Sequence, residues 1–420
     1  MIRFILADLK RFWPGVVAVV LLVAFASALG MAVRIEERAL RLGSARAADR
    51  FDLVVGAPGS ETQLILSSIF LQPSPLTLIP GSVLQTLSQD PRVEFAAPVG
   101  FGDSYRGYQI VGTSAEFIAK SGFGIAEGSN LAGTFDAVVG SLVSVPLGTV
   151  IHPVHGVAGE ATDDHPEISY RIVGRMKETA TPWDRAILVP IEGVWRTHGL
   201  GEAEGAHAHD AHDAHEAHGG EGEAHAAHDS GEERIGPPWT GDLPGVPAIL
   251  VKPKTIANAY QLRGEYRTEA TLAVFPGEVL TRLYSTLGDA RLALGATAAA
   301  AQALAGAAVM LVTMMHLAQR RRQIGALRAF GAPRLAIFAV VWAELVLVIG
   351  VGIAAGLGLG YAAAHAISAT ITRQSGMTLP VTIDGNDILF AGLLLAIAGV
   401  ISLVPAWIAY RQPIARALRS

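Results

Sequence analysis

Residues 207–218, HAHDAHDAHEAH, bring together many side chains that can bind a metal ion. Imidazole and carboxylate groups alternate with alanine, and further histidines and acids continue to residue 233. Imidazole nitrogen favours zinc, copper or nickel over calcium or magnesium. A closed structural zinc site uses four ligands in fixed positions, whereas this run offers many interchangeable ones. We therefore expect transient binding of Zn²⁺ or another transition metal, with His207, His209, His212, His215, His218, His225 and His228 as the ligands.

The tract at 202–233 has the composition of an insert rather than of a folded domain. It is rich in Ala, His, Asp, Glu and Gly, it has no apolar period, and it contains no lysine or arginine. Such a segment cannot bury a core, so we expect a disordered surface insert. A solvated acidic loop without a role in metal binding is the alternative.

A second group of potential ligands lies in HPVHGVAGEATDDHPE, residues 152–167. If this loop folds back on itself, a site of three or four ligands forms, and the alternative is the polar end of a hairpin. The candidates are His152, His155, Asp163, Asp164 and His165.

Motifs for catalysis do not stand out in this sequence. It shows no HExxH motif, no Ser/His/Asp arrangement and no paired-carboxylate motif, and Asp184 in TPWDRA is expected to be structural. The absence of cysteine excludes disulfides, thiolate metal sites and thiol catalysis. We therefore do not expect an enzyme, and we expect no intrinsic cofactor.

The hydropathy pattern is that of an integral membrane protein. Hydrophobic residues make up 51% of the chain and charged residues 16%, and the mean hydropathy is +0.39. Four uncharged runs each exceed the roughly 20 residues that a helix needs to cross a bilayer. We predict transmembrane helices at 12–33, 291–319, 335–366 and 388–410.

The distribution of arginine and lysine predicts the orientation in the membrane. Basic residues gather in the N-terminus (1–11), in the 320–334 segment and in the tail (411–420), whereas the 367–387 loop has only Arg373. Basic segments stay in the cytoplasm. We therefore expect a protein of the bacterial inner membrane with both termini on the cytoplasmic side and residues 34–290 in the periplasm. No basic patch with interleaved aromatic residues occurs, which argues against nucleic acid as a partner.

The 34–290 segment combines helical stalks with short β-rich runs. FDLVVG, YQIVGT, FDAVVG, SYRIVGR, RAILVP and PAILVKP are bounded by Gly, Pro and Asp, as strands commonly are. The flanking RIEERALRLGSARAADR is rich in helix formers and has a Glu37/Arg41 pair at i,i+4, and GEVLTRLYSTLGDARLALG has a helical period. The predicted fold class is an α-helical membrane protein of four spans with a large extracytoplasmic α/β (α+β) domain between spans 1 and 2.

Small residues recur at every fourth position in two of the predicted spans. Gly352, Gly356 and Gly360 form a GxxxGxxxG stripe, and small side chains let helix backbones approach closely in lipid. We therefore predict helix packing at these glycines. A similar stripe comprises Gly295, Ala299, Ala303 and Ala307. Chance in a Gly/Ala-rich chain is the alternative for both stripes, and it weighs more for the second.

The segment RRRQIGALRAFGAPR, residues 320–334, separates the second and third spans. Ile324, Leu327 and Phe330 fall at i, i+3 and i+6, which predicts a short amphipathic helix that ends near Gly331. Such a helix suits contact with a soluble partner or anchoring on anionic membrane lipid. The predicted surface comprises Arg320, Arg321, Arg322, Ile324, Gly325, Leu327, Arg328, Phe330 and Gly331.

This segment, followed by a Glu-bearing span and a Gly-rich run, resembles the same region of the FtsX/MacB-type ABC transporter permeases. The C-terminal PAWIAYRQPIARALRS is similar to the closing signature of that family. FDLVVGAPGS, FDAVVG and TPWDRAILVP resemble its periplasmic core more weakly. The likeness extends over the whole architecture but over only part of the chain in motif.

The resemblance implies a permease subunit that is driven by an ATPase. The sequence contains no Gly-Lys dipeptide and hence no Walker A loop, so ATP is expected on a separate ABC ATPase subunit. The resemblance also implies a second permease copy and coupling to the ATPase through 320–331. A periplasmic binding protein, an adaptor or a lipoprotein is a further candidate partner. The expected outcome is export, extrusion or periplasmic regulation, with a zinc link suggested by the His-rich tract.

A function of a different class remains open. The same four spans and the His-rich tract would also suit a membrane-anchored metal-binding sensor or regulator without a transport cycle.

Overall fold

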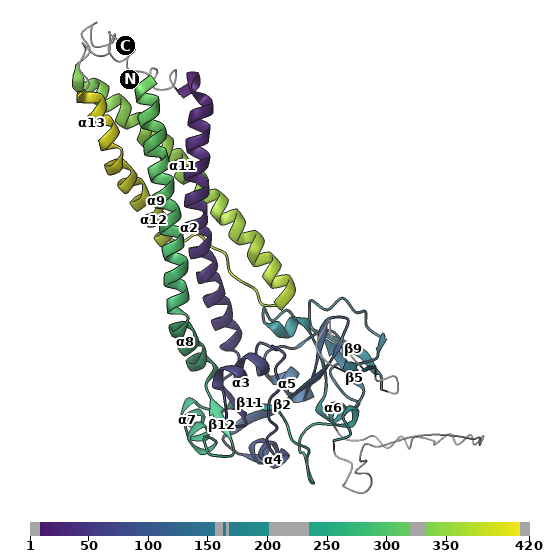
Figure 1. Cartoon of the computed structure of the whole chain (residues 1–420). Helices are drawn as coiled ribbons and strands as arrows, with labels where there is room; N and C mark the ends of the chain where they lie inside the picture. Colours follow the sequence, from purple (N-terminus) through teal and green to yellow (C-terminus); the bar gives the residue numbers. More distant parts are fainter. Residues whose placement is uncertain (1–8, 156–162, 165–167, 201–234, 320–332, 412–420) are drawn as a thin grey trace, which may run out of the picture. The chain divides into compact units, whose positions relative to one another are not determined.

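The computed structural model describes residues 9–155, 163–164, 168–200, 235–319 and 333–411. It divides into two compact units (Figure 1). The membrane unit comprises Met1–Gly43, Tyr284–Gln374 and Thr378–Ser420, and the external unit comprises Ser44–Leu283 and Ser375–Met377. The His-rich tract at 202–233 and the predicted coupling helix at 320–331 lie outside the described residues.

Long apolar helices build the membrane unit. Within the described residues, four segments are long and apolar enough to cross a membrane, in the number and order that the sequence predicts. Helices α2 (Trp13–Ala48) and α11 (Arg334–Ser375) exceed the predicted spans. At 1.5 Å per residue they are about 54 and 63 Å long, so both extend beyond a hydrocarbon layer of about 30 Å. The other helices of this unit are α9 (Gly288–Gln319), α12 (Gly385–Ile401) and α13 (Leu403–Arg411).

The last span is interrupted at Ser402, between α12 and α13. Pro405 has no N–H to donate to the carbonyl of Ile401, so the regular helix cannot continue through this turn. Ser402 instead bonds twice to Ala398 O, through its N–H at 2.8 Å and its Oγ at 2.7 Å. The N–H and the hydroxyl of Ser402 are thus both satisfied at this interruption of a membrane-spanning segment.

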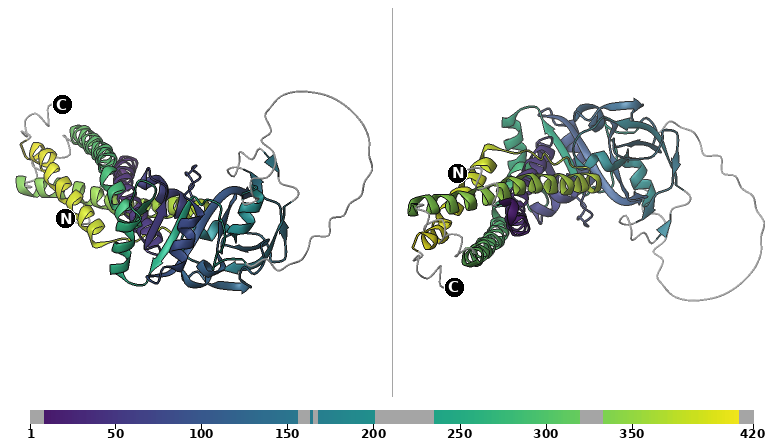
Figure 2. Two further views of the ribbon diagram at one scale, coloured as in Figure 1. Left: turned by 90° about the horizontal axis from the view of Figure 1, so that it is seen from below. Right: turned by 90° about the horizontal axis from the view of Figure 1, so that it is seen from above.

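Branched aliphatic side chains form the core of the membrane unit. Val19 and Val23 of α2 pack with Val309 of α9 and with Ile349 and Ile353 of α11. Leu394 and Ala398 of α12 pack against this cluster. These contacts hold the helices together as a bundle (Figures 1 and 2).

A mixed sheet forms the centre of the external unit. Over the described residues its main path runs in the order β12-β1-β11-β2-β3-β10-β5-β9-β4, with β6, β7 and β8 attached to the side. The strands are β1 (Leu53–Gly56), β2 (Val93–Tyr105), β3 (Tyr108–Thr113), β4 (Ile125–Gly128), β5 (Asp136–Val139), β6 (Val150–Ile151), β7 (Val154–His155), β8 (Asp163–Asp164), β9 (Tyr170–Met176), β10 (Ala186–Pro190), β11 (Ala248–Pro253) and β12 (Leu272–Val274).

Strand β2 joins the two halves of this sheet. Its first part pairs with β11, and its second part pairs with β3 after a register shift between Phe101 and Asp103. All the β-rich runs that the sequence indicates lie in strands of this sheet, but β2 itself was not predicted. Pro98, Gly100 and Gly102 interrupt its apolar pattern, and such residues commonly end strands.

Short helices pack on the sheet and enclose an aromatic core. Phe117, Phe123 and Trp183 are fully buried, with ring centroids 5.0 to 5.8 Å apart, and Trp183 donates its indole N–H to Ile69 O at 3.1 Å. The side chains of Ser60, Ser114 and Thr255 cap three of the helices. The helices are α3 (Glu61–Ser68), α4 (Gly81–Gln89), α5 (Ala115–Lys120), the 3₁₀ helix η1 (Pro182–Arg185), α6 (Ile191–Thr197), α7 (Ile256–Glu265) and α8 (Pro276–Thr286).

Asp184 organises the turn before β10, in the structural role that TPWDRA predicts. Its buried carboxylate accepts hydrogen bonds from the N–H and hydroxyl of Thr179 and from Ala180 N–H at 2.7 to 3.0 Å. Ala180 has a φ of +59°, a strained conformation for a residue with a side chain. The carboxylate therefore holds a turn that the backbone would not adopt by itself.

Asp184→Ala should lower the free energy of unfolding of the external unit by about 2 kcal/mol, because buried donors lose their acceptor. Urea unfolding of the full chain, followed by tryptophan fluorescence, measures this. The exposed Asp242 gives the matched control, since Asp242→Ala removes a carboxylate with no such role. Equal unfolding midpoints for the two variants would contradict the assignment.

Candidate functional site

The three glycines of the GxxxGxxxG stripe lie on the face of α11 that contacts α2. A Cβ atom at Gly356 would lie 2.6 Å from Ser27 Cβ and 2.7 Å from Ala24 O. At Gly352 and Gly360 the nearest side-chain atoms would be within 2.8 Å. No residue larger than glycine fits without separating the two helices. This close approach makes α2 and α11 one packed pair.

Beyond this stripe, α2 is fastened to the segment between α11 and α12. The guanidinium of Arg38 binds the carboxylate of Asp387 through two hydrogen bonds of 2.8 and 3.2 Å, and it also donates to Thr382 O. The Asp387 side chain is fully buried, and it accepts the N–H of Asp384 at 2.9 Å as part of a capping box. A charge at the start of α12 is thus neutralised by α2, which fixes the two helices to each other.

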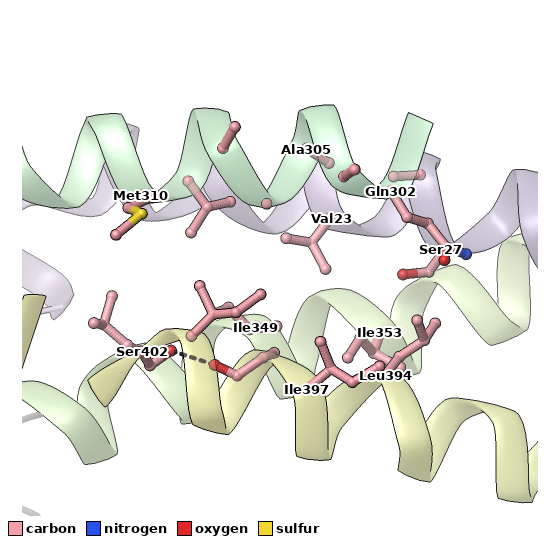
Figure 3. A pocket seen from close by; sticks show the side chains of 18 of the residues that line it. Val23, Ser27, Gln302, Ala305, Met310, Ile349, Ile353, Leu394, Ile397 and Ser402 are labelled. Carbon is pink, nitrogen blue, oxygen red and sulfur yellow. Dashed lines mark hydrogen bonds between the residues drawn. The ribbon is translucent and has the colours of Figure 1, made fainter. Parts of the chain in front are cut away.

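An apolar cavity of about 490 Å³ opens between the helices of the membrane unit. The small residues Ala299, Ala303 and Ala307 of α9 line one side of it, whereas a Cβ on Gly295 would meet nothing within 4 Å. The predicted alanine stripe therefore faces a cavity within this chain. The labelled side chains in Figure 3 include Val23, Ser27, Gln302, Met310, Ile349, Ile353, Leu394 and Ile397.

A cluster of three potential metal ligands lies in the external unit. Asp103 on β2 is 2% exposed, and each of its carboxylate oxygens faces an imidazole. Oδ1 lies 3.3 Å from Nδ1 of His155, and Oδ2 lies 3.4 Å from Nε2 of His198. One ligand atom from each of the three residues lies within 4.8 Å of the others.

Backbone structure sets the positions of these three side chains. Asp103 follows the irregularity in β2, and His155 on β7 is its direct partner across the antiparallel ladder. His198 is the residue that ends α6, and it donates its backbone N–H to Val194 O and Arg196 O. The ligands therefore come from two strands and a helix end.

Buried groups below the cluster hold the last turn of α6. Tyr170 OH lies 3.1 Å from Thr197 Oγ1. The hydroxyl of Thr197 donates to Gly193 O at 2.9 Å. Burial raises the pKa of Tyr170 to about 12, so the phenol stays neutral. The pKa of His198 is raised chiefly by its hydrogen bond to Asp103, against the opposing effect of burial. The carboxylate thus attracts positive charge at this position.

Comparison with known families bears on the membrane unit. Residues 295–414 match the family model described as FtsX-like permease C-terminal. The match covers most of α9, the segment between α9 and α11, and all of α11, α12 and α13. This part of the membrane unit is that of an FtsX-like permease. FtsX-like permeases are transmembrane subunits of ABC transporters and are not catalytic.

Two solved structures resemble this permease at low sequence identity. One is the periplasmic region of MacB from Actinobacillus actinomycetemcomitans, with 10% identity and a TM-score of 0.32 over 56% of this chain and 95% of that one. The other is the extracellular domain of the noncanonic ABC-type transporter YknZ from Gram-positive bacteria. It has 9% identity and a TM-score of 0.29 over 53% of this chain and 98% of that one. No curated protein matches the permease.

The second predicted ligand group is only partly brought together. His155 joins the cluster, and the β7–β8 hairpin pairs it with Asp163 in register. His152 instead lies with Nδ1 3.3 Å from Ile168 O, and His165 lies outside the described residues. Asp103 and His198 were not predicted as ligands, and no spacing motif connects them to His155. The seven histidines of the His-rich tract also lie outside the described residues.

Proposed function

We propose that this permease transmits movement from a separate ATPase to its external unit, and that it thereby extrudes a substrate or regulates a periplasmic partner. The observation that carries the proposal is the match of residues 295–414 to the FtsX-like permease model. The predicted coupling helix at 320–331 falls inside this match. The sensor without a transport cycle is less well supported, because the same match identifies a transporter subunit.

Three places where the chain passes between the two units support mechanical transmission. The chain crosses at Gly43/Ser44 within α2, at Leu283/Tyr284 within α8, and around Ser375–Met377 at the end of α11. In the external unit, Gly376 has a φ of +76° and lies against Thr181 O and the Arg185 side chain. A helix carries displacement along its axis because each turn is hydrogen-bonded to the next. Movement of α2 or α11 in the membrane would thus reach the external unit through the covalent chain.

The apolar cavity suggests the class of substrate. Its lining is almost entirely aliphatic, with Ser27, Gln302, Thr313 and Ser402 as its polar members. Transfer of a hydrated ion into such surroundings costs free energy because its charge loses the surrounding water, whereas a hydrocarbon chain has no such cost. We infer that a lipid chain or a lipid-modified substrate enters here. A second permease copy completes the transporter in this proposal, and an adaptor, lipoprotein or binding protein receives the movement outside.

The coupling helix provides the test of this function. Leu327→Asp and Phe330→Asp each place a charge in the predicted apolar stripe, and both should abolish co-purification of an ATPase subunit with the tagged full-length chain. Ala329 lies away from that stripe by the helical period, so Ala329→Asp serves as the matched control and should retain the ATPase. Mass spectrometry of the purified complex and its rate of ATP hydrolysis are the two measurements.

Two results would overturn the proposal. The first is that the unaltered chain, extracted from its own membranes, captures no protein with a Walker A sequence. The second is that the Leu327 and Phe330 variants retain the same ATPase and the same rate of hydrolysis as the Ala329 variant.

A further inference from the structure

We propose that Asp103, His155 and His198 form a binding site for a divalent transition-metal ion of the zinc class. None of its ligands is among the seven histidines of the His-rich tract, and the proposal does not depend on the transport function proposed above. Its ligands come from β2, β7 and the end of α6, so it belongs to the folded part of the external unit.

The distances between the ligand atoms support a metal site over a simple ion pair. Charge-assisted hydrogen bonds between nitrogen and a carboxylate are about 2.7–2.9 Å long. The two nitrogen–oxygen separations at Asp103 are 3.3 and 3.4 Å. A tetrahedral zinc ion with bonds of about 2.0–2.1 Å holds neighbouring ligand atoms about 3.3–3.4 Å apart. Each imidazole nitrogen thus stands about this far from its own carboxylate oxygen. One ligand atom from each of the three residues lies within 4.8 Å of the others, so the three side chains can converge on one ion.

The chemistry of the ligands selects the metal. Two imidazoles and one carboxylate suit Zn²⁺, whereas Ca²⁺ and Mg²⁺ prefer oxygen ligands throughout. Three protein ligands with a fourth position available to water or another molecule are typical of open zinc sites. His155 is 49% exposed, so an ion can reach the site from solvent.

The surroundings hold the ligands in place before an ion arrives. Asp103 is almost fully buried, and the ladder between β2 and β7 sets His155 opposite to it. The Tyr170–Thr197 hydrogen bond fixes the turn that ends at His198. A Cβ on Gly102 would lie 3.3 Å from Nε2 of His198, so the glycine leaves room for the imidazole. Supporting contacts of this kind raise metal affinity because they orient the ligands.

The test uses the full-length permease in detergent, with the seven histidines of the His-rich tract replaced by asparagine. Titration calorimetry with Zn²⁺ should then give about one ion per chain, and Co²⁺ should give the visible absorption of a tetrahedral site. In this background, His155→Ala and His198→Ala should each weaken binding by about 100-fold or more, since removing a ligand costs more than disturbing its supporting contacts.

His152→Ala is the matched control, because this histidine belongs to the same loop but bonds to a backbone carbonyl outside the cluster. It should retain full stoichiometry. Circular dichroism in the presence of a chelator checks that every variant folds. Failure of the background chain to bind Zn²⁺ would overturn the proposal and leave an imidazole–carboxylate pair only. Unchanged binding in the His155 and His198 variants would overturn it as well. Neither result bears on ATPase capture, so the two proposals are tested independently.

Discussion

Gly356→Leu is expected to separate α2 from α11 and to abolish ATP-driven activity of the assembled transporter. Even the Cβ of alanine would lie 2.7 Å from the backbone oxygen of Ala24, and a backbone atom cannot turn aside as a side chain can. Overpacking of a well-packed contact costs about 1–3 kcal/mol, and leucine adds three further carbons. We expect a loss of about 3 kcal/mol for leucine and about 1 kcal/mol for alanine.

The same helix offers a matched control for this substitution. A Cβ on Gly358 would meet nothing within 4 Å, so Gly358→Leu changes the same residue type two positions away without a clash. Equilibrium unfolding in detergent micelles gives the stability of each variant, and ATP hydrolysis by the purified complex gives its activity. Equal behaviour of the Gly356 and Gly358 variants would show that the α2–α11 contact is not tightly packed.

The parts of the structure that were predictable depend on local patterns. Run length and the absence of charge predict four spans, because crossing a bilayer needs about 20 apolar residues in sequence. Runs such as YQIVGT and RAILVP lie in β3 and β10, since β-branched residues between turn formers are a signal within a few positions. Glycines at every fourth position similarly share one helix face, and that face lies against α2.

The parts that were not predictable depend on long-range pairing. Asp103, His155 and His198 are brought together by a strand register and a helix end, and neither is encoded in the spacing of the three residues. Arg38 and Asp387 are separated by 349 positions. Charge counting treats Asp387 only as part of an external loop. Its role as a buried partner appears only when α12 is placed beside α2.

The conspicuous histidines and the inconspicuous ones therefore differ in kind. A run of interchangeable ligands signals metal binding by composition, whereas a site of defined geometry needs a scaffold that holds few ligands in fixed positions. His155 is the one residue that belongs both to the ligand group predicted at 152–167 and to the cluster in the structure. The seven histidines of the His-rich tract remain a prediction from composition.

The second prediction with a large expected effect concerns Asp387. Asp387→Asn should lower the free energy of unfolding of the membrane unit by about 3 kcal/mol, because the charge of Arg38 loses the buried group that neutralises it. Asparagine keeps a side-chain oxygen for the N–H of Asp384, so the cap of α12 is retained and the effect of charge is isolated. Unfolding in detergent micelles measures the loss. Asn386→Ala, at the exposed neighbouring position, should change stability by less than about 0.5 kcal/mol.

A double variant then separates pairing from burial. Arg38→Met combined with Asp387→Leu removes both charges, and apolar replacement of a buried ion pair is often neutral or stabilising. The double variant should consequently be more stable than the Asp387→Asn protein, although it has lost every hydrogen bond of the pair. If the ion pair is what holds α2 and α12 in register, the rate of ATP hydrolysis by the purified complex should still be lowered in the double variant. An apolar contact lacks the directional hydrogen bonds from Arg38 to Asp387 and Thr382. Normal stability together with normal activity would instead mean that the ion pair serves only to neutralise a buried charge.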